Sequence, residues 1–303
     1  MKHLTYYILF VALLHVNTLF GQGCSDAGVC TLGSMDSGEE DSIRHTFSLG
    51  QTLEMGERFT LISKTIAEVR IAIFDRGFVQ ARIPYFFAAG DLGNNAGLGD
   101  LIISINVLFM NNKDIEMIFV AGGKVASDNA NDLNELGQSF PMPYQSSAGT
   151  HDLMVGLTIN RGLWHFAVGY QHALNGNENG FLHNVWQGDP KAFDYFESNQ
   201  LKRGDDLMVR IERKFLKDNK MFTLGLLPIW RFQKDEIIDA QNQSMLLDGS
   251  NQLTININAG YTYNINENLR LRFTYGNPVL WRKTRADGLT RFFVFYAGMV
   301  YVP

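Results

Sequence analysis

From about residue 43 onward, the chain contains repeated runs of roughly 10 to 13 residues in which apolar and polar positions alternate with a period of two. In the run 253–263, every second side chain from Leu253 to Tyr263 is apolar or aromatic, whereas the residues between them are Thr, Asn or Gly. Such alternation is typical of β-strands with one apolar and one polar face. It predicts about twelve strands, at 43–54, 64–75, 77–88, 98–110, 114–125, 150–160, 162–173, 205–216, 219–232, 251–264, 268–277 and 290–302.

The links between these strands alternate between short and long. Tight turns fall at 75–77, 111–113, 160–162, 217–219 and 264–268, and the longer links include 126–149, 174–204 and 233–250. Bacterial outer-membrane barrels have an even strand number, short periplasmic turns and long external loops. The pattern therefore predicts an all-β fold: a single transmembrane antiparallel β-barrel of about 12 strands, with both termini on the periplasmic side. A soluble β-sandwich would also alternate, but its loops would not sort by length.

Aromatic residues near the strand ends favour the membrane interpretation. Two girdles of aromatic side chains mark the two interfaces of a membrane barrel. The girdle near the tight turns would contain Trp164, Phe222 and Phe109, and the opposite girdle Tyr170, Trp230 and Phe232.

The composition agrees with a β-barrel and excludes several other classes. Hydrophobic residues make up 46% of the chain and charged residues 19%, with a net charge of −5. The mean hydropathy of −0.08 is too low for a bundle of membrane-spanning helices. A nucleic-acid-binding protein would carry a strongly basic surface, so we expect no nucleic-acid partner.

The N-terminal region predicts export from the cytoplasm. A basic start at residues 1–3 precedes the mostly apolar stretch 4–20, which is typical of a signal peptide at residues 1–21. Residues 22–42 then form a periplasmic N-terminal segment, and 43–303 the barrel. Cys24 and Cys30 are a candidate disulfide, because an exported protein reaches an oxidising compartment. An alternative is a lipoprotein acylated at Cys24.

In a barrel whose apolar side chains face lipid, the polar set lines the lumen. Two interpretations stay open: a basic ladder that selects anionic or polar solutes, or glutamates that pair with the arginines and neutralise buried charge. A barrel of this size holds a narrow pore or a packed ionic interior. The candidate lumen-lining residues are Glu68, Arg70, Arg82, Glu116, Arg210, Glu212, Lys214, Arg231, Arg270 and Arg272.

The long link 174–204 is unusually aromatic for a segment that faces water. Aromatic clusters favour protein interfaces, but the same side chains would also serve as a lid over the barrel mouth. The residues concerned are Phe181, Trp186, Phe193, Tyr195 and Phe196.

Catalytic and metal-binding motifs are weak. The segment around His172 is similar to the His-x-Ser-Asn-Gly segment of outer-membrane phospholipase A, but Leu174 stands where the nucleophilic serine is required. Asp128 and Asp132 offer oxygens for Ca²⁺ without the spacing of a calcium loop, so a solvated loop is the simpler interpretation. We therefore expect no enzymatic activity, no cofactor and no metal.

A short stretch resembles a known family. Residues 81–87, which contain Pro84 and Tyr85, are followed by Gly97-Leu98-Gly99-Asp100, and this pair of motifs resembles the family of outer-membrane transporters assigned to the MetA pathway of phenol degradation. The resemblance covers about residues 81–110 in motif and 45–303 in architecture. It implies passage of small, often hydrophobic molecules, and it transfers no binding residue.

These observations together predict a channel or transporter for small solutes, with a narrow, basic-leaning lumen, in the outer membrane of a Gram-negative bacterium. Outer-membrane lipid and lipopolysaccharide would surround it. The alternative is a non-catalytic barrel subunit of a larger outer-membrane complex, which would contact other outer-membrane proteins through its external loops.

Overall fold

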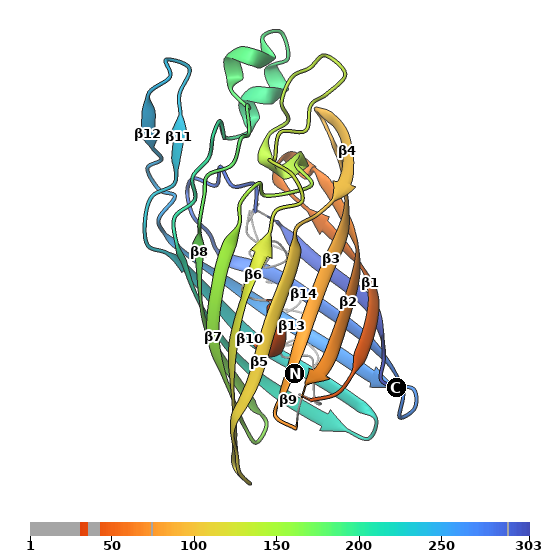
Figure 1. Ribbon diagram of the computed structural model, residues 1–303. Coiled ribbons are helices and arrows are strands. Elements are labelled where there is room, and N and C mark those ends of the chain that lie inside the picture. Colours follow the sequence, from red (N-terminus) through yellow and green to blue (C-terminus); the bar gives the residue numbers. More distant parts are fainter. Residues whose placement is uncertain (1–30, 36–42, 74, 290) are drawn as a thin grey trace, which may run out of the picture.

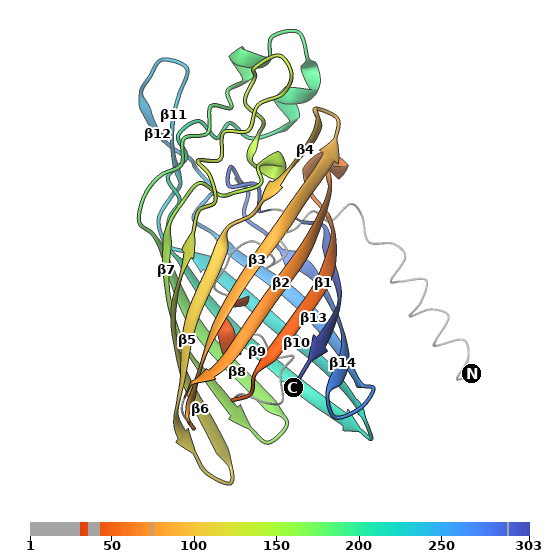
Figure 2. The same ribbon diagram turned by 45° about the vertical axis from the view of Figure 1, so that its right-hand side comes forward.

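The computed structural model describes residues 31–35, 43–73, 75–289 and 291–303. Antiparallel strands close into one barrel, in which each strand pairs with the next barrel strand along the chain, except that β4 and β5 both pair with β3, and β1 pairs with β15 (Figures 1 and 2). The prediction of an all-β barrel of about 12 strands is confirmed. The barrel strands are β1 (Thr46–Met55), β2 (Leu61–Ile73), β3 (Gly77–Gly90), β4 (Gly93–Leu98), β5 (Leu101–Asn111), β6 (Ile115–Val125), β7 (Asp152–Arg161), β8 (Trp164–Ala173), β9 (Asp206–Lys217), β10 (Lys220–Arg231), β13 (Leu253–Asn264), β14 (Leu269–Leu280) and β15 (Phe293–Tyr301).

Strands β4 and β5 together occupy one position in the barrel. The first half of β3 pairs with β5 and its second half pairs with β4. The break between them falls at Gly99, whose backbone N–H donates to the carbonyl of Pro84 at 2.8 Å. A side chain at position 99 would lie 2.6 Å from the Pro84 ring, so glycine is required for this close approach. The Pro84 and Gly99 motifs thus shape the corner where the strand changes direction.

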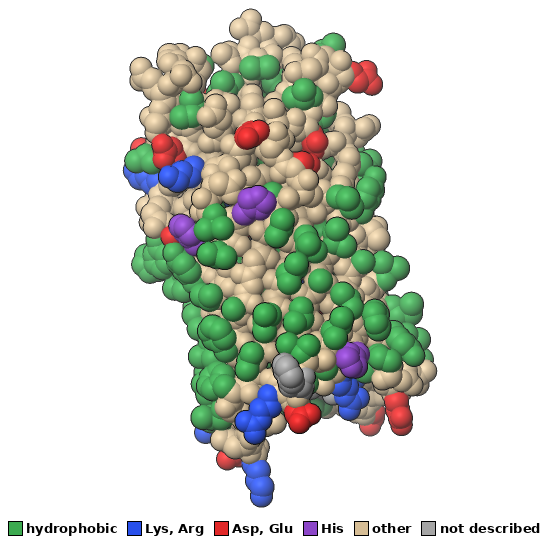
Figure 3. All heavy atoms as spheres, viewed as in Figure 1, with side chains coloured by type: hydrophobic (Ala, Val, Ile, Leu, Met, Phe, Trp, Pro, Cys, Tyr) green, Lys and Arg blue, Asp and Glu red, His purple; other side chains and the backbone are tan. Residues whose placement is uncertain are grey.

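The exterior of the barrel is apolar around its middle. Outward-facing side chains such as Ile105, Val155, Val168 and Leu224 are 40–50% exposed. Apolar groups cover the middle of the wall in Figure 3, whereas most charged groups lie near its two ends. This is the surface that a lipid bilayer requires. The six aromatic residues assigned to the girdles are all exposed: Phe109, Trp164, Tyr170, Phe222, Trp230 and Phe232.

The long links build a layer above one end of the barrel, opposite the tight turns and the C-terminus (Figure 1). The sequence pattern did not predict the small elements of this layer. The small elements of this layer are the 3-10 helices η3 (Glu57–Phe59), η4 (Met142–Tyr144), η5 (His183–Trp186) and η6 (Pro190–Asp194), and the hairpin of β11 (Glu236–Ile238) and β12 (Ser244–Leu246). No helix among the described residues is long and apolar enough to cross a membrane.

Residues 31–35, which include the 3-10 helix η2 (Gly33–Met35), lie inside the barrel. Leu32 and Met35 are fully buried, in a cluster with residues of β5 to β10. The backbone N–H of Ser34 donates to Oδ1 of Asn106 on β5 at 2.9 Å. The segment expected in the periplasm therefore places at least these five residues in the lumen. The signal peptide, Cys24 and Cys30 lie outside the described residues.

Candidate functional site

The lumen has two chemically different walls. Leu108 on β5, Ile118 on β6, Met154 on β7 and Met208 on β9 make an apolar wall, which Leu32 and Met35 cover. The opposite wall, on β1 to β3 and β13 to β15 with parts of β9 and β10, is polar and borders a cavity of about 110 Å³. Residues 31–35 therefore fill the apolar side, and the remaining space is lined mainly by polar groups.

The cavity brings together five of the candidate lumen residues. They come from β2, β3, β9 and β14, which lie far apart in the sequence, and Nη1 of Arg210 lies 3.3 Å from Oε1 of Glu212. Hydroxyl and amide groups of Thr52, Thr223 and Asn258 complete the lining. The five charged residues are Glu68, Arg82, Arg210, Glu212 and Arg272.

A second charged group lies at the end of the lumen near the long links, and Arg231 lies at its centre. Its guanidinium contacts Asp206 at 2.7 Å, Asp235 at 2.9 Å and Asp287 at 2.8 Å. Asp287 also pairs with Arg282 at 2.7 Å. Arg231, Asp235 and Asp287 are at most 3% exposed, so the charges are compensated by one another and not by water. These ion pairs fasten the links 232–252 and 281–292 to the ends of β9 and β10.

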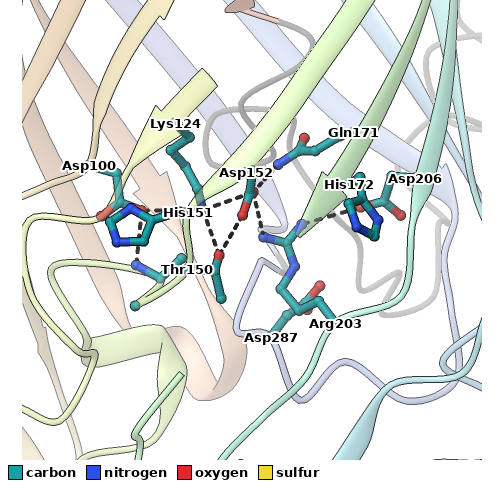
Figure 4. Close-up of polar contacts among 12 residues, drawn as sticks. Asp100, Lys124, Thr150, His151, Asp152, Gln171, His172, Arg203, Asp206 and Asp287 are labelled. Atoms are coloured by element: carbon teal, nitrogen blue, oxygen red, sulfur yellow. Dashed lines mark hydrogen bonds and ion pairs between the residues drawn. The ribbon is translucent and has the colours of Figure 1, made fainter. Parts of the chain in front are cut away.

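The same network continues around the barrel mouth (Figure 4). Arg203 contacts Asp152 at 3.5 Å and Asp206 at 3.3 Å, and Lys124 lies 3.2 Å from Asp152 and 3.3 Å from Asp100. Gln171 also donates to Asp152. On β1 and β2, Glu54 accepts from Lys64 at 3.2 Å and from Arg291 at 2.8 Å.

The buried charges are close to balance. Among the described residues, nine buried side chains are Lys or Arg and seven are Asp or Glu. The prediction of a basic-leaning lumen is therefore not confirmed. It was made from strand positions alone, and the loops contribute acidic residues such as Asp235 and Asp287.

The pKa of Asp287 leads to a prediction about how the stability of the protein depends on pH. Burial by itself would raise this pKa, but Arg282, Arg231 and Arg203 outweigh burial and hold it far below its usual range. The pKa of an unfolded Asp is about 3.9, so Asp287 stabilises the fold above that pH, and the stabilisation is lost as the pH falls toward the lower folded pKa. We expect a melting temperature that is steady from about pH 7 to 5 and falls below about pH 4. Asp287→Asn should lower it at neutral pH and reduce the decline in acid; an unchanged decline would contradict this role.

Gly288 gives a prediction on loop packing. Its φ is +64°, and an added Cβ would lie 2.5 Å from the carbonyl carbon of Met142. In Gly288→Ala, left-handed strain of about 1 kcal/mol adds to overpacking of about 1–3 kcal/mol, so we expect a loss of at least about 2 kcal/mol in the free energy of unfolding. The matched control is Gly162→Ala, where φ is +55° and nothing lies within 4 Å. Urea titrations of both variants check this; equal losses would mean that the contact with Met142 does not matter.

The other candidate lumen residues do not form one ladder. Arg70 is buried, with its guanidinium 4.2 Å from the centre of the Phe78 ring. Glu116 accepts from Asn160 at 2.8 Å, near a tight turn. Lys214 and Arg270 are half-buried near the tight-turn ends of β9 and β14. Arg231 belongs to the network at the mouth.

Four of the five aromatic residues of link 174–204 turn inward. Phe181, Trp186 and Tyr195 are at most 3% exposed, in a cluster that also contains Phe86 and Tyr144. The hydroxyl of Tyr195 lies 3.1 Å from the hydroxyl of Tyr144 and 3.1 Å from that of Thr60. Phe196 packs partly buried beside the β11–β12 hairpin, and Phe193 is 57% exposed. Most of these aromatic side chains are therefore packed against other parts of the chain, and Phe193 is the one left exposed among the five.

The residues of the weak catalytic and metal motifs form hydrogen bonds or ion pairs with neighbouring side chains. Nδ1 of His172 lies 2.7 Å from Oδ1 of Asp205, and the imidazole is half exposed. Asp128 and Asp132 both accept from Ser146, at 3.0 and 3.1 Å. In the part of the chain that the structure describes, no group of three His, Cys, Asp or Glu side chains is placed to hold a metal ion.

Sequence reasoning missed much of the network at the mouth. Asp152 and Asp206 are the first residues of β7 and β9. Both lie inside the predicted strands 150–160 and 205–216, and the alternation places Asp206 on the polar face with Arg210 and Glu212, but neither was named as a lumen candidate. The remaining residues lie in links, where no periodicity indicates which side chains turn inward. These are Arg203, Asp235, Arg282, Asp287 and Arg291.

The closed barrel with an apolar exterior is the fold of outer-membrane β-barrels. Among solved structures, the chain is similar to the COG4313 outer membrane channel from Pseudomonas putida F1, with a TM-score of 0.58, 12% identity, and coverage of 88% of this chain and 98% of that chain. It is also similar to the NanC porin, with a TM-score of 0.50, 7% identity, and coverage of 85% and 100%. At these identities the likeness shows the fold alone. No family model and no curated protein matches the chain, so the resemblance to the MetA-pathway transporters stays a prediction.

Proposed function

We propose that this protein is an outer-membrane channel for small polar solutes, which pass through the polar half of the lumen. The observation that carries the proposal is the cavity beside residues 31–35, which is lined by charged and hydroxyl groups inside a barrel with an apolar exterior. A polar cavity inside an outer-membrane barrel offers polar solutes a path through the apolar bilayer.

The proposed location is the outer membrane of a Gram-negative bacterium, with the tight turns in the periplasm and the long links outside. The exposed apolar band would contact lipid, and the layer of links would lie among lipopolysaccharide head groups. The fold shared with the COG4313 outer membrane channel and the NanC porin supports an outer-membrane location.

Solute entry into liposomes tests the proposal. Purified full-length protein in liposomes should allow small solutes such as arabinose to enter, whereas large oligosaccharides should be excluded because the space beside residues 31–35 is narrow. Liposomes prepared with heat-unfolded protein are the control. Swelling no faster than the control for every solute would contradict the channel function.

A second candidate is a barrel subunit of a larger outer-membrane complex. Several apolar side chains of the external links are exposed: Leu133 at 52%, Leu136 at 83%, Phe193 at 57% and Leu246 at 59%. Exposed apolar groups rimmed by polar residues mark interaction surfaces. Gentle detergent extraction of the tagged protein should then recover a stoichiometric partner, which Leu136→Glu/Phe193→Glu would release. Recovery of the barrel alone would count against this candidate.

A further inference from the structure

The cavity in the polar half of the lumen holds charges of both signs. Three arginines, Arg82, Arg210 and Arg272, face the same space as Glu68 and Glu212. The charged lining residues therefore sum to +1, and the cavity presents both cationic and anionic groups. By rough comparison, about 10–15 Å³ holds one water, so about 110 Å³ accommodates a small solute.

Glu212 has an unused hydrogen-bonding group. Oε1 of Glu212 pairs with Arg210, but Oε2 has no hydrogen-bond partner among the described residues, although the side chain is only 2% exposed. Gly225 on the neighbouring strand leaves the space that this side chain occupies, because an added Cβ there would lie 2.2 Å from Cγ of Glu212. A buried carboxylate oxygen without a donor is unfavourable, and a solute that carries a donor would satisfy it.

We propose that this cavity is a binding site for small zwitterionic solutes of the amino-acid class. The carboxylate of the solute would contact Arg82 and Arg272, and its ammonium group would donate to Oε2 of Glu212. An arginine contacts a carboxylate through two parallel hydrogen bonds, and a carboxylate oxygen accepts from an ammonium group. This inference rests on the proposed channel function, and it names the class of solute.

Tracer uptake into liposomes with the full-length protein tests the inference. The probes are L-serine, propionate, which lacks the ammonium group, and ethanolamine, which lacks the carboxylate. In the wild type we expect saturable entry of L-serine, with weaker competition by propionate and by ethanolamine. Glu212→Gln keeps the shape of the side chain and removes its charge, so the half-saturating concentration of L-serine should rise roughly tenfold, whereas propionate entry should not fall, because propionate has no ammonium group to donate to Oε2.

Glu116→Gln is the matched control, because this glutamate lies near a tight turn and does not line the cavity. It should leave L-serine uptake unchanged. Competition by propionate or ethanolamine as strong as by L-serine would overturn the inference in the wild type, even if Glu212→Gln failed to fold. Conductance of K⁺ and Cl⁻ without any preference for L-serine would overturn the solute class and leave the channel function standing. Absence of both conductance and uptake would overturn both.

Discussion

Replacing Arg231 by Met is expected to cause the largest loss of stability. The substitution removes the cation that lies between Asp206, Asp235 and Asp287, and these carboxylates are at most 4% exposed. Removal of one partner from a buried charged group leaves the other uncompensated and costs about 3–5 kcal/mol. Urea titration in lipid vesicles should show that loss in the free energy of unfolding.

Two further variants separate charge from packing. Arg231→Met/Asp235→Asn removes one of the uncompensated carboxylates, so it should recover part of the loss. Lys234→Met breaks an ion pair with Asp248 whose side chains are 39% and 91% exposed, and it should leave stability unchanged because water screens that pair. If Arg231→Met unfolded at the same urea concentration as the wild type, the network would not be what holds the links to the barrel.

Leu32→Asp/Met35→Asp is expected to have the largest effect on conductance. Both side chains are fully buried against the apolar wall of the lumen, where an unpaired carboxylate is strongly unfavourable. Residues 31–35 should therefore leave the wall and widen the path beside it. We expect a severalfold rise in single-channel conductance.

The matched control is Leu136→Asp, which adds a carboxylate at a loop position that is 83% exposed. Its conductance should equal that of the wild type. A double variant with unchanged conductance, at a yield of folded protein similar to the control, would mean that residues 31–35 do not limit the path.

The strands were predictable because their signal repeats. Each inward or outward side chain follows from a period of two, and the apolar exterior keeps this pattern in register from β1 to β15. The turns were predictable because the two membrane sides impose different link lengths. Strand β4 was not predicted, because its sequence Gly-Asn-Asn-Ala-Gly-Leu has little apolar alternation and falls almost wholly in the link between the predicted strands 77–88 and 98–110.

The interior was less predictable, because its contacts join parts of the chain that no local pattern connects. Arg231 was assigned to the lumen from the alternation, but its partner Asp287 lies 56 residues away in a link. The burial of Leu32 and Met35 depends on an apolar patch contributed by β5 to β10. The alternation therefore identified several of the charged side chains that face the lumen, but it could not identify the residues with which they pair.

Single-channel recording of the purified wild-type protein in a planar lipid bilayer tests the central claim most directly. A path confined to the polar half of the lumen predicts small, discrete steps of conductance. Under a KCl gradient, the reversal potential should lie on the side of the equilibrium potential of Cl⁻, since the charged residues lining the cavity sum to +1. Either of two results would contradict the account: no conductance from folded barrels, or steps as large as those of an open general porin.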